Sequence, residues 1–479
     1  MDNFWRGLLF IVDFYLVIYI VFFDHKKPVN TLAWIVTIVF MPVVGIILYI
    51  LFSDRRHFRK SRELKAKMVY DEKLYSLVNE QLHILDGQDI LYNDQAMQNY
   101  HDIIRMNVKY GKSPYTQDNQ VKIFTDGQSK YASLIEDLQN AQSSINLSYY
   151  IFRDDHICNQ IMKILREKAA AGLEVRLIYD FIGSMHTPKR IFRDLRKAGG
   201  EINVLFPFFF ANFRSNYRNH RKIVVIDGSI GYLGGMNIGD EYAGKGNLRP
   251  WRDTHLRIVG SAVYMLQARF LMDWAYLSKS VPPLSEKYFP SIQPENKGAV
   301  GMQIVSSGPD NDTEQIKIDF IKMILSSQKT LYIQTPYFIP DDSILDALKI
   351  AVLSGVDVSI MLPRIYDRLI VYCASNSYIS PLMELGVKFY LYDGFLHSKM
   401  IIMDDKITSI GSCNMDIRSF SLDFEVNAFI YDSKFSAHCQ DIFLEDTKNA
   451  HLITPESHSQ RPLLVRTFEP IFRLFSPLF

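Results

Sequence analysis

The sequence predicts an α/β protein made of two similar halves that follow two membrane-spanning helices. Three observations predict this class: two long apolar runs near the N-terminus, a strand–helix–strand pattern that occurs twice, and a histidine motif that occurs once per copy. The chain has 479 residues, 48% hydrophobic and 22% charged, which is ordinary for a folded protein and excludes disordered or collagen-like chains. That length suggests roughly three units at about 150 residues each.

Charge and cysteine content exclude further classes. Lys plus Arg (53) nearly balance Asp plus Glu (52), so the net charge of +1 leaves no overall electrostatic footprint for nucleic acid. The absence of a C-x-x-C pair argues against a zinc ribbon or a dithiol redox motif. We therefore expect reduced thiols, as in a cytosolic compartment, at Cys158, Cys373, Cys413 and Cys439.

Residues 1–53 are expected to form two transmembrane helices. Residues 7–23 carry one charge, Asp13, and residues 31–52 carry none. A helix crosses a bilayer core with about 20 apolar residues. A signal peptide is the alternative for the first run, but no small-x-small cleavage site is present and a second run follows at once. Core helices are disfavoured because charge is excluded from every face.

Basic residues set the expected orientation. Several lysines and arginines lie between residues 55 and 67, whereas the turn between the runs has only Lys26 and Lys27. The positive-inside rule predicts a multi-pass protein of the cell membrane with its large C-terminal part facing the cytoplasm. Residues 54–117 are expected to form a basic juxtamembrane and helical connector, because apolar residues recur at helical spacing between 74 and 85.

The remainder of the chain repeats itself. Residues 143–155 resemble residues 329–342, and each stretch leads from a strand into a helical pattern that ends at Gly172 or Gly355. A second strand follows each glycine, so the order is strand, helix, strand in both copies. This order predicts a largely parallel sheet in each of two α/β sandwich halves, residues 118–295 and 296–479.

The strongest chemical signal is the pattern H-x-K-x(4)-D-x(6)-G-[GS]-x-N. It occurs in each half, at His220, Lys222, Asp227 and Asn237 and again at His397, Lys399, Asp404 and Asn414. Histidine and lysine, two residues apart, share one face of a strand, and a hairpin returns the asparagine to the same end. One such motif is often an ordinary strand edge, but two copies in matching places indicate a site.

These side chains suit a phosphoryl group. The imidazole supplies a nucleophile or an acid, the ammonium a positive charge, and the carboxamide a hydrogen-bond donor. Two halves that face each other would place two histidines on opposite sides of one phosphorus. In-line displacement needs that arrangement, because one group attacks while the other protonates the leaving oxygen.

The duplicated motif is identified as the HKD signature of the phospholipase D superfamily. Within it, the chain resembles the bacterial cardiolipin synthases over nearly its whole length. The stretches that carry this resemblance are 31–34, 251–255, 307–310 and 476–478, together with Pro42, Gly45 and residues 48–49 of the second apolar run. Ser53 departs from the glycine expected after that run, but it lies outside the chemistry.

The resemblance implies a fold of two phospholipase-D-like halves and a phosphatidyl transfer. One histidine attacks the phosphorus of phosphatidylglycerol and the other protonates the departing glycerol. The second histidine then deprotonates a hydroxyl of another phosphatidylglycerol, which gives cardiolipin. The resemblance implies no metal and no cofactor, and the sequence has neither metal-spaced ligands nor a P-loop. The implied partners are phosphatidylglycerol and membrane lipids, with no nucleic acid.

Residue roles follow from the same resemblance. His220 is the expected nucleophile, and Lys222, Lys399, Asn237 and Asn414 are expected to hold the phosphate. Each histidine also needs an acid to fix its tautomer. Glu425 is assigned to the half of His397 and Asp253 to the half of His220, with an ordinary surface ion pair as the alternative. Asp227 and Asp404 belong to the catalytic signature, but we expect them to hold turns at the far end of the strand.

Two segments and several activities remain open at this point. The phenylalanine-rich residues 205–214 are expected either to touch the membrane interface or to form a buried loop, and residues 468–479 either an interfacial helix or a segment docked on the core. The closest alternative activity is a phospholipase D that uses water, and a close variant would use phosphatidylethanolamine. A nuclease is disfavoured by the neutral charge and apolar runs, and an inactive scaffold by two intact motifs.

Overall fold

The computed structural model describes most of the chain as two compact units. The described residues are 2–24, 28–52, 74, 76–87, 90–206, 217–278, 282, 285–292, 297–311, 313–474 and 476. The first unit, called the N-terminal unit, comprises Met1–Ser61 and Phe208–Asn216, and the second, called the catalytic body, comprises Arg62–Pro207 and Tyr217–Phe479. The basic residues 55–67 and the loop residues 207–214 lie outside the described residues.

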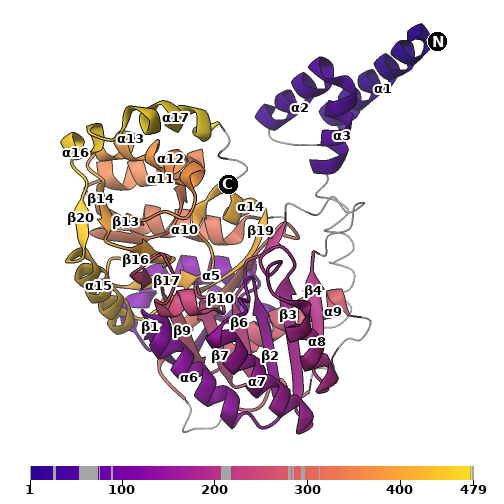
Figure 1. Ribbon diagram of the computed structural model, residues 1–479. Helices are drawn as coiled ribbons and strands as arrows, with labels where there is room; N and C mark the ends of the chain where they lie inside the picture. Colours follow the sequence, from indigo (N-terminus) through magenta and orange to yellow (C-terminus); the bar gives the residue numbers. More distant parts are fainter. Residues whose placement is uncertain are drawn as a thin grey trace. The chain divides into compact units, whose positions relative to one another are not determined.

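The N-terminal unit contains three helices (Figure 1). They are α1 (Asp2–Phe22), α2 (Pro28–Phe40) and α3 (Pro42–Phe52). Their common core is formed by Ile20, Ile38 and Tyr49, with Trp34 packed edge-on against Tyr49. The first apolar run is thus one helix, as expected. Among the helices described, none combines the length and the apolar character needed to cross a membrane.

The second apolar run is not the single helix that the sequence predicts. It breaks at Met41, between α2 and α3, because Pro42 has no N–H to donate and its ring favours the first turn of a new helix. The two short helices then pack closely. A Cβ at Gly45 would lie 2.7 Å from the Cα of Ile38, so only glycine permits this approach.

The catalytic body is built on one mixed sheet with sixteen strands, which runs through both halves. The first half contributes β1 (Thr116–Phe124), β2 (Ser144–Tyr149), β3 (Glu174–Asp180), β4 (Glu201–Leu205), β6 (Ile223–Ile226), β7 (Ile230–Gly234) and β9 (His255–Val259). The second contributes β10 (Val300–Ser307), β11 (Thr330–Gln334), β13 (Asp357–Pro363), β14 (Lys388–Tyr392), β16 (Met400–Met403), β17 (Ile407–Gly411), β19 (Asp423–Tyr431) and β20 (Ala450–Leu452). One more strand, β5 (Arg218–Asn219), pairs with β19.

Strand order confirms that the halves are related. The strands of the two halves follow the same order, which is β1-β9-β7-β6-β2-β3-β4 in the first half and β10-β19-β17-β16-β11-β13-β14 in the second. Antiparallel pairing of β1 with β10 joins the two halves. The expectation of largely parallel sheets is wrong. Along the main strand order, parallel pairing is confined to β2-β3-β4 and β11-β13-β14, because tight turns such as the one between β6 and β7 connect antiparallel neighbours.

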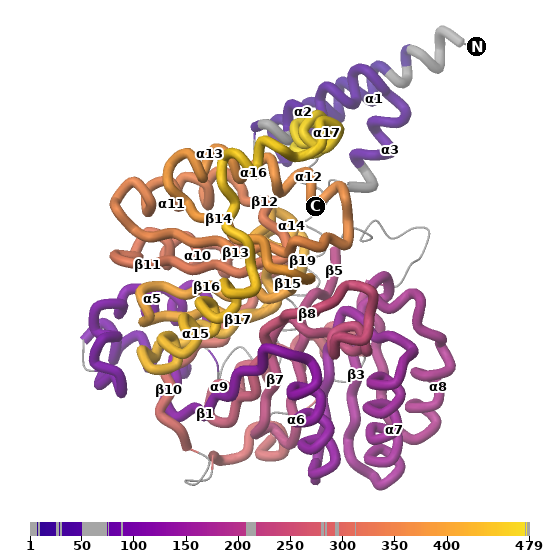
Figure 2. The backbone as a smooth tube through the Cα atoms, turned by 60° about the vertical axis from the view of Figure 1, so that its left-hand side comes forward, coloured from indigo at the N-terminus to yellow at the C-terminus, as the bar shows by residue number. Residues whose placement is uncertain are grey.

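Helices cover the sheet on both sides. The first half carries α6 (Gly127–Asn140), α7 (His156–Ala170), α8 (Lys189–Lys197) and α9 (Ala262–Leu277). The second carries α10 (Gln315–Ser326), α11 (Asp342–Leu353), α12 (Leu369–Asn376), α13 (Ile379–Met383), α14 (Ile417–Ser421), α15 (Ser433–Thr447), α16 (Pro455–Ser459) and α17 (Leu463–Arg473). Figure 2 shows the second half, in orange and yellow, above the first.

Three apolar clusters form the core of the catalytic body. One lies within each half, and a third is shared between them, with residues of β6, β9 and α9 from the first half and of β16, β19 and α15 from the second. Strand residues alternate between clusters: Ile223 and Val225 join the shared one, while Val224 and Ile226 join the first-half one. All four cysteines are buried free thiols.

Two peripheral segments pack onto the second half. Residues 76–86 are helical, as expected, and with α5 (His101–Lys109) they bury Val78, Leu85 and Ile104 in the second-half cluster. The C-terminal helix α17 packs against α12, and Phe472 packs against the same cluster, so docking is observed. Leu463 at the start of α17 is 76% exposed, and Leu474, just after its end, is 80% exposed.

Candidate active site

The two motifs meet at one cavity in the catalytic body. This cavity has a volume of about 500 Å³ and is lined by His220 and Asn237 from the first half and by His397 and Asn414 from the second. Each histidine follows a two-residue strand, β5 (Arg218–Asn219) or β15 (Phe395–Leu396), and is separated by two residues from the start of β6 or β16. The hairpin into β7 or β17 returns the chain so that the asparagine faces the same cavity, as the spacing predicts.

Each imidazole contacts a buried carboxylate. His220 Nδ1 lies 2.9 Å from Glu425 Oε1, and His397 Nδ1 lies 2.7 Å from Asp253 Oδ2. Both acids have zero exposed surface, so the alternative of surface ion pairs is wrong. An Nδ1–H that donates to a carboxylate leaves Nε2 as the reactive nitrogen on the opposite side of the ring.

The pairing of acids with histidines is the reverse of the sequence prediction. Glu425, from the second half, serves His220, and Asp253, from the first half, serves His397. Strand pairing between the halves explains the exchange. The N-terminal end of β19 lies parallel to β5, so that Phe424 faces Asn219, and β8 (Trp251–Arg252) lies parallel to β15. Each half therefore completes the site of the other.

Further hydrogen bonds fix the two acids. Ser412 Oγ donates to Glu425 Oε2 at 2.5 Å, and the Thr254 N–H donates to Asp253 Oδ1 at 2.7 Å. Burial raises the pKa of Glu425 to about 7, against the opposing charge of Lys222. Burial also acts to raise the pKa of Asp253, but the facing His397 and the charge of Lys399 hold it below its usual range.

Burial favours the neutral form of both imidazoles. It lowers the pKa of His220 well below the ordinary 6.5, and the nearby charges of Lys222 and Lys399 lower it further. Burial with the charge of Lys399 lowers the pKa of His397 to about 4. A neutral imidazole has the lone pair that a nucleophile or a general base requires.

The motif lysines are buried beside the histidines. Lys222 Nζ donates to the backbone carbonyl of His220 at 2.6 Å, and Lys399 Nζ donates to that of His397 at 2.5 Å. Burial lowers the pKa of Lys222 to about 7 and that of Lys399 to about 8. Neither lysine is among the residues that line the cavity, but the histidines beside them are, so an anion that entered the cavity would favour the charged forms of the lysines.

The motif aspartates lie elsewhere, at turns. Asp227 accepts from the N–H groups of Gln142, Ser143 and Ser144 at 2.7–2.9 Å, and Asp404 accepts in the same way from the N–H groups of residues 328–330. Neither lines the cavity. Both therefore join the start of β2 or β11 to the end of β6 or β16, as expected for turn-holding residues.

Sequence reasoning missed several residues that line the cavity. The ring centroid of Tyr150 lies 5.3 Å from that of His220, and the ring of Trp251 lies 5.4 Å from that of His397. Arg218 and Arg368 also line the cavity. Tyr150 and Tyr337 both lie at the repeated strand ends and both line the cavity, a signal that the repeat already contained. In the described part of the chain, no group of three acids, histidines or cysteines is arranged to hold a metal.

Comparisons with known proteins identify the family. The family model "Cardiolipin synthase, PLD-like domain" matches residues 134–248 and 320–447, and "Phospholipase_D-nuclease N-terminal" matches residues 11–53. A cardiolipin synthase of Listeria monocytogenes is 42% identical over 482 residues, 98% of each chain. The "Major cardiolipin synthase ClsA" of Bacillus subtilis is 43% identical over 483 residues, again 98% of each.

A solved structure supports the fold. Phosphatidylserine synthase of Haemophilus influenzae superposes with a TM-score of 0.59 at 15% identity, over 79% of this chain and 100% of that one. The duplicated fold and the paired histidines define an enzyme of the phospholipase D type. The relatives narrow this class further, because they match almost end to end: the chain belongs to the cardiolipin synthase family and is a phosphatidyltransferase. The resemblance seen in the sequence is thereby confirmed.

Proposed function

We propose that this enzyme transfers a phosphatidyl group from one phosphatidylglycerol to another through a phosphohistidine on His220. The observation that carries the proposal is the pair of imidazoles in one cavity, each with Nδ1 against a buried carboxylate. Such a pair supplies one nucleophile and one acid–base group for two successive displacements at phosphorus.

In the first displacement, the Nε2 lone pair of His220 attacks phosphorus and the bond from phosphorus to the glycerol oxygen breaks. His397, which takes up a proton at Nε2 when the anionic phosphate of the donor enters the cavity, gives that proton to that oxygen. In the second, His397 takes the proton from a hydroxyl of the acceptor lipid, whose oxygen attacks while the phosphorus–nitrogen bond breaks. Lys222, Lys399 and the two asparagines stabilise the charge on the non-bridging oxygens.

The acids support the assignment of His220 as nucleophile. Its partner, Glu425, has a pKa raised to about 7 by burial, so it favours a charged imidazolium less strongly. Asp253 has a lowered pKa because of the facing His397 and Lys399, despite its burial, and so stays ionised. An ionised partner favours the imidazolium that an acid requires. His397 is therefore the better acid and His220 the better nucleophile.

The proposal includes a membrane anchor. Residues 1–53 would hold the enzyme in the cell membrane as two transmembrane segments, the second interrupted at Met41, with the catalytic body in the cytoplasm. Large apolar side chains are exposed along these helices, among them Phe10 at 72% and Phe40 at 79%. The exposed apolar side chains of α17 and of Leu369 and Ile370 in α12 would add contact with lipid.

A reconstitution assay tests the reaction. Purified enzyme with phosphatidylglycerol as the sole lipid should give cardiolipin and glycerol, with no metal added. Phosphatidic acid and glycerol as the products would instead identify a hydrolase. A requirement for added phosphatidylethanolamine would show that a different lipid is one of the two substrates.

The covalent step has its own test. His397→Asn weakens the base of the second step, so labelled phosphatidyl should accumulate on His220, whereas His220→Asn should trap none. The trapped fraction is expected to be small, since His397 also serves the first step. The adduct should survive an alkaline quench and be lost in acid. Label on His397 in His220→Asn would reverse the assignment, and label on Cys413 would overturn the mechanism.

A further inference from the structure

The cavity is asymmetric although the two halves are alike. Positions equivalent in the two motifs are 177 residues apart. Two residues before His397 stands Phe395, whose ring stacks 5.7 Å from the imidazole, and Trp251 lies on the same side. At the equivalent position before His220 stands Arg218. The wall at His397 is therefore aromatic, and the wall at His220 is cationic.

A second arginine joins that cationic wall from the other half. Arg368 lines the same cavity, just before α12. The side chain of Tyr150 lines the cavity with both of them. Burial raises the pKa of Tyr150 and the charges of Asp180 and Asp423 raise it further, whereas the charges of Arg218 and Arg368 act in the opposite direction. Two guanidinium groups from different halves thus line the same cavity as one phenol, whose ring lies against His220.

These two arginines differ from the others in the cavity. Arg153 pairs with Glu241 and Arg418 pairs with Asp423, each at 3.3 Å. Within the part of the chain that the structure describes, neither Arg218 nor Arg368 has a carboxylate within ion-pair distance. Arg218 donates one bond, to the Tyr217 carbonyl at 2.7 Å.

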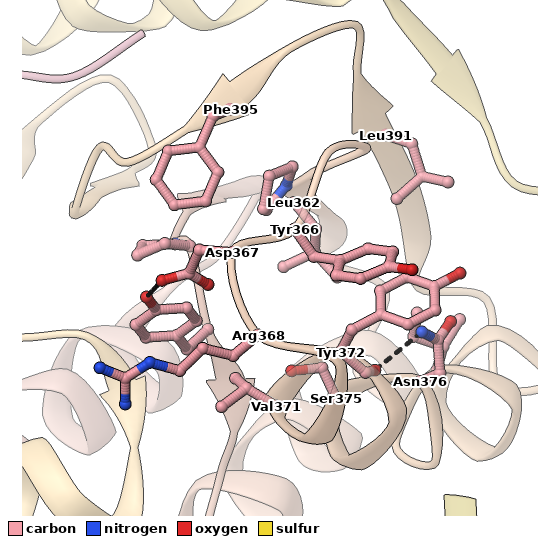
Figure 3. Close-up of a pocket in the computed structure, with 14 residues that line it drawn as sticks. Leu362, Tyr366, Asp367, Arg368, Val371, Tyr372, Ser375, Asn376, Leu391 and Phe395 are labelled. Atoms are coloured by element: carbon pink, nitrogen blue, oxygen red, sulfur yellow. Dashed lines mark hydrogen bonds between the residues drawn. The ribbon is translucent and has the colours of Figure 1, made fainter. Parts of the chain in front are cut away.

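The neighbour of Arg368, Asp367, is held by another side chain. Asp367 accepts from the Tyr337 hydroxyl at 2.6 Å. Figure 3 shows Arg368 directed away from the paired rings of Tyr366 and Tyr372, which lie at the far side of the adjoining small pocket. The cavity therefore presents two guanidinium groups and a phenol beside His220, and the carboxylates of Asp367, Asp416 and Asp423 also line it.

The proposed reaction calls for a second phosphate site. In that reaction, the histidines, lysines and asparagines of the two motifs serve the phosphate of the donor lipid. The acceptor lipid is also a phosphodiester, and its headgroup hydroxyl must reach the phosphorus of the donor. We propose that Arg218, Arg368 and the Tyr150 hydroxyl bind the phosphate of the acceptor phospholipid. This inference rests on the proposed function. Guanidinium groups bind phosphate through paired, charge-assisted hydrogen bonds.

Such a site would select an anionic lipid over a neutral acceptor. The same enzyme can be assayed with an anionic lipid or with a neutral acceptor. Labelled glycerol is such a neutral acceptor, because it can take the phosphatidyl group from the enzyme and become labelled phosphatidylglycerol. That exchange needs the donor site and both histidines, but no second phosphate. Loss of one charge-assisted hydrogen bond costs about 1.5–3 kcal/mol, which converts to a factor of roughly 10 to 160 in acceptor binding.

The experiment compares the two acceptors in one preparation. Arg368→Gln is expected to raise the KM for acceptor phosphatidylglycerol at least tenfold, and to lower cardiolipin formation far more than glycerol exchange. Arg364→Gln is the matched control, since Arg364 is exposed and pairs with Asp393 outside the cavity. Both rates should stay at the wild-type level in that variant.

The outcomes separate this inference from the proposed function. Equal losses of exchange and of cardiolipin formation in Arg368→Gln would overturn the acceptor site, and so would no loss of either. Arg218→Gln, on the other half, should give the same split, and an unaltered KM for the acceptor would exclude Arg218 from the site. Wild-type enzyme that neither exchanges glycerol nor makes cardiolipin would instead contradict the proposed function.

Discussion

At the scale of single residues, the two acids distinguish the two histidines. Glu425 and Asp253 are both fully buried and both contact Nδ1, yet their pKa values shift in opposite directions. The sequence contains both acids, but spacing along one chain cannot show which histidine each acid meets. That depends on β5 and β8, two-residue strands that pair across the halves.

The crossed pairing predicts different effects for the two amide variants. Asp253→Asn weakens His397 as a base, so the second step slows and the phosphatidyl adduct on His220 should accumulate. Glu425→Gln weakens the nucleophile itself, so no adduct should accumulate. Both should lower kcat by about 10²- to 10⁴-fold. Quantifying the adduct after an alkaline quench checks this, and accumulation in Glu425→Gln alone would reverse the two roles.

The pH profile should report the charge of Lys222. Attack requires neutral His220, so kcat/KM falls at low pH as the imidazole becomes protonated. Burial and then Lys222 lower the pKa of His220 below 6.5, which places this acid limb below that pH. Lys222→Met removes a positive charge that opposed protonation. The pKa should rise, and the acid limb should move to higher pH.

The quantity to compare is the pH at which the acid limb of kcat/KM lies. The overall activity is not informative, because Lys222→Met also removes a side chain that stabilises the phosphate. Lys349→Met provides the control, since Lys349 pairs with Asp346 on the surface of α11. An acid limb that stays in place, or moves to lower pH, would contradict the electrostatic role of Lys222.

At the scale of elements, the sequence predicts the hairpins well and the sheet only partly. The strand–helix–strand repeats and the β6–β7 and β16–β17 hairpins lie where the motif spacing indicates. The antiparallel remainder of the sheet was not predicted, because a strand pattern shows which faces are buried but not which neighbour a strand takes. The break at Pro42 was also missed, since helices in apolar runs tolerate proline when other groups compensate.

The turn-holding aspartates give a prediction for stability. Asp227→Asn or Asp404→Asn removes the charge that accepts three backbone N–H groups, while asparagine still tolerates the positive φ of 50° or 53° at these turns. Unfolding should become easier by about 1–3 kcal/mol, with kcat of the folded enzyme little altered. Thermal melts and assays below the melting range measure the two effects.

Asp405→Asn is the matched control for that stability experiment. Asp405 has the same φ of 53° as its neighbour Asp404, but its carboxylate pairs with Lys406 at the surface. Its melting temperature should stay near that of the wild type. A large loss of kcat in Asp227→Asn without loss of stability would show instead that this aspartate takes part in the reaction.

At the scale of the whole molecule, the residues before the first half belong to two different units. The chain up to Ser61 belongs to the N-terminal unit, whereas Val78, Met97, Ile103 and Val108 are buried in the core of the second half. The apolar spacing of residues 74–85 predicts a helix but not its partner. The segment that the sequence presents as a connector therefore belongs to the catalytic body from about residue 76 onward.

This division predicts opposite results for two truncations. A chain that begins at Arg62 keeps every described residue of that core, so it should fold, melt cooperatively and turn over phosphatidylglycerol in mixed micelles. A chain that begins at Thr116 loses the buried side chains of residues 78–108. Each buried apolar side chain contributes about 1.5–3 kcal/mol, and several together exceed the roughly 5–15 kcal/mol that stabilises a typical protein. The shorter chain should therefore be unfolded.

The longer of the two truncated chains also tests the membrane anchor. The chain that begins at Arg62 lacks α1 to α3 but keeps the basic residues Arg62, Lys65 and Lys67, so any remaining attachment to anionic vesicles should be electrostatic and should disappear in high salt. Flotation with vesicles at low and high salt measures this attachment. The full-length protein, which should stay bound at both salt concentrations, is the reference.

A truncated chain that is unfolded would contradict the division into two units. A folded one that resists high salt would place the membrane contact on the catalytic body itself, where α17 exposes Leu463, Leu464 and Leu474.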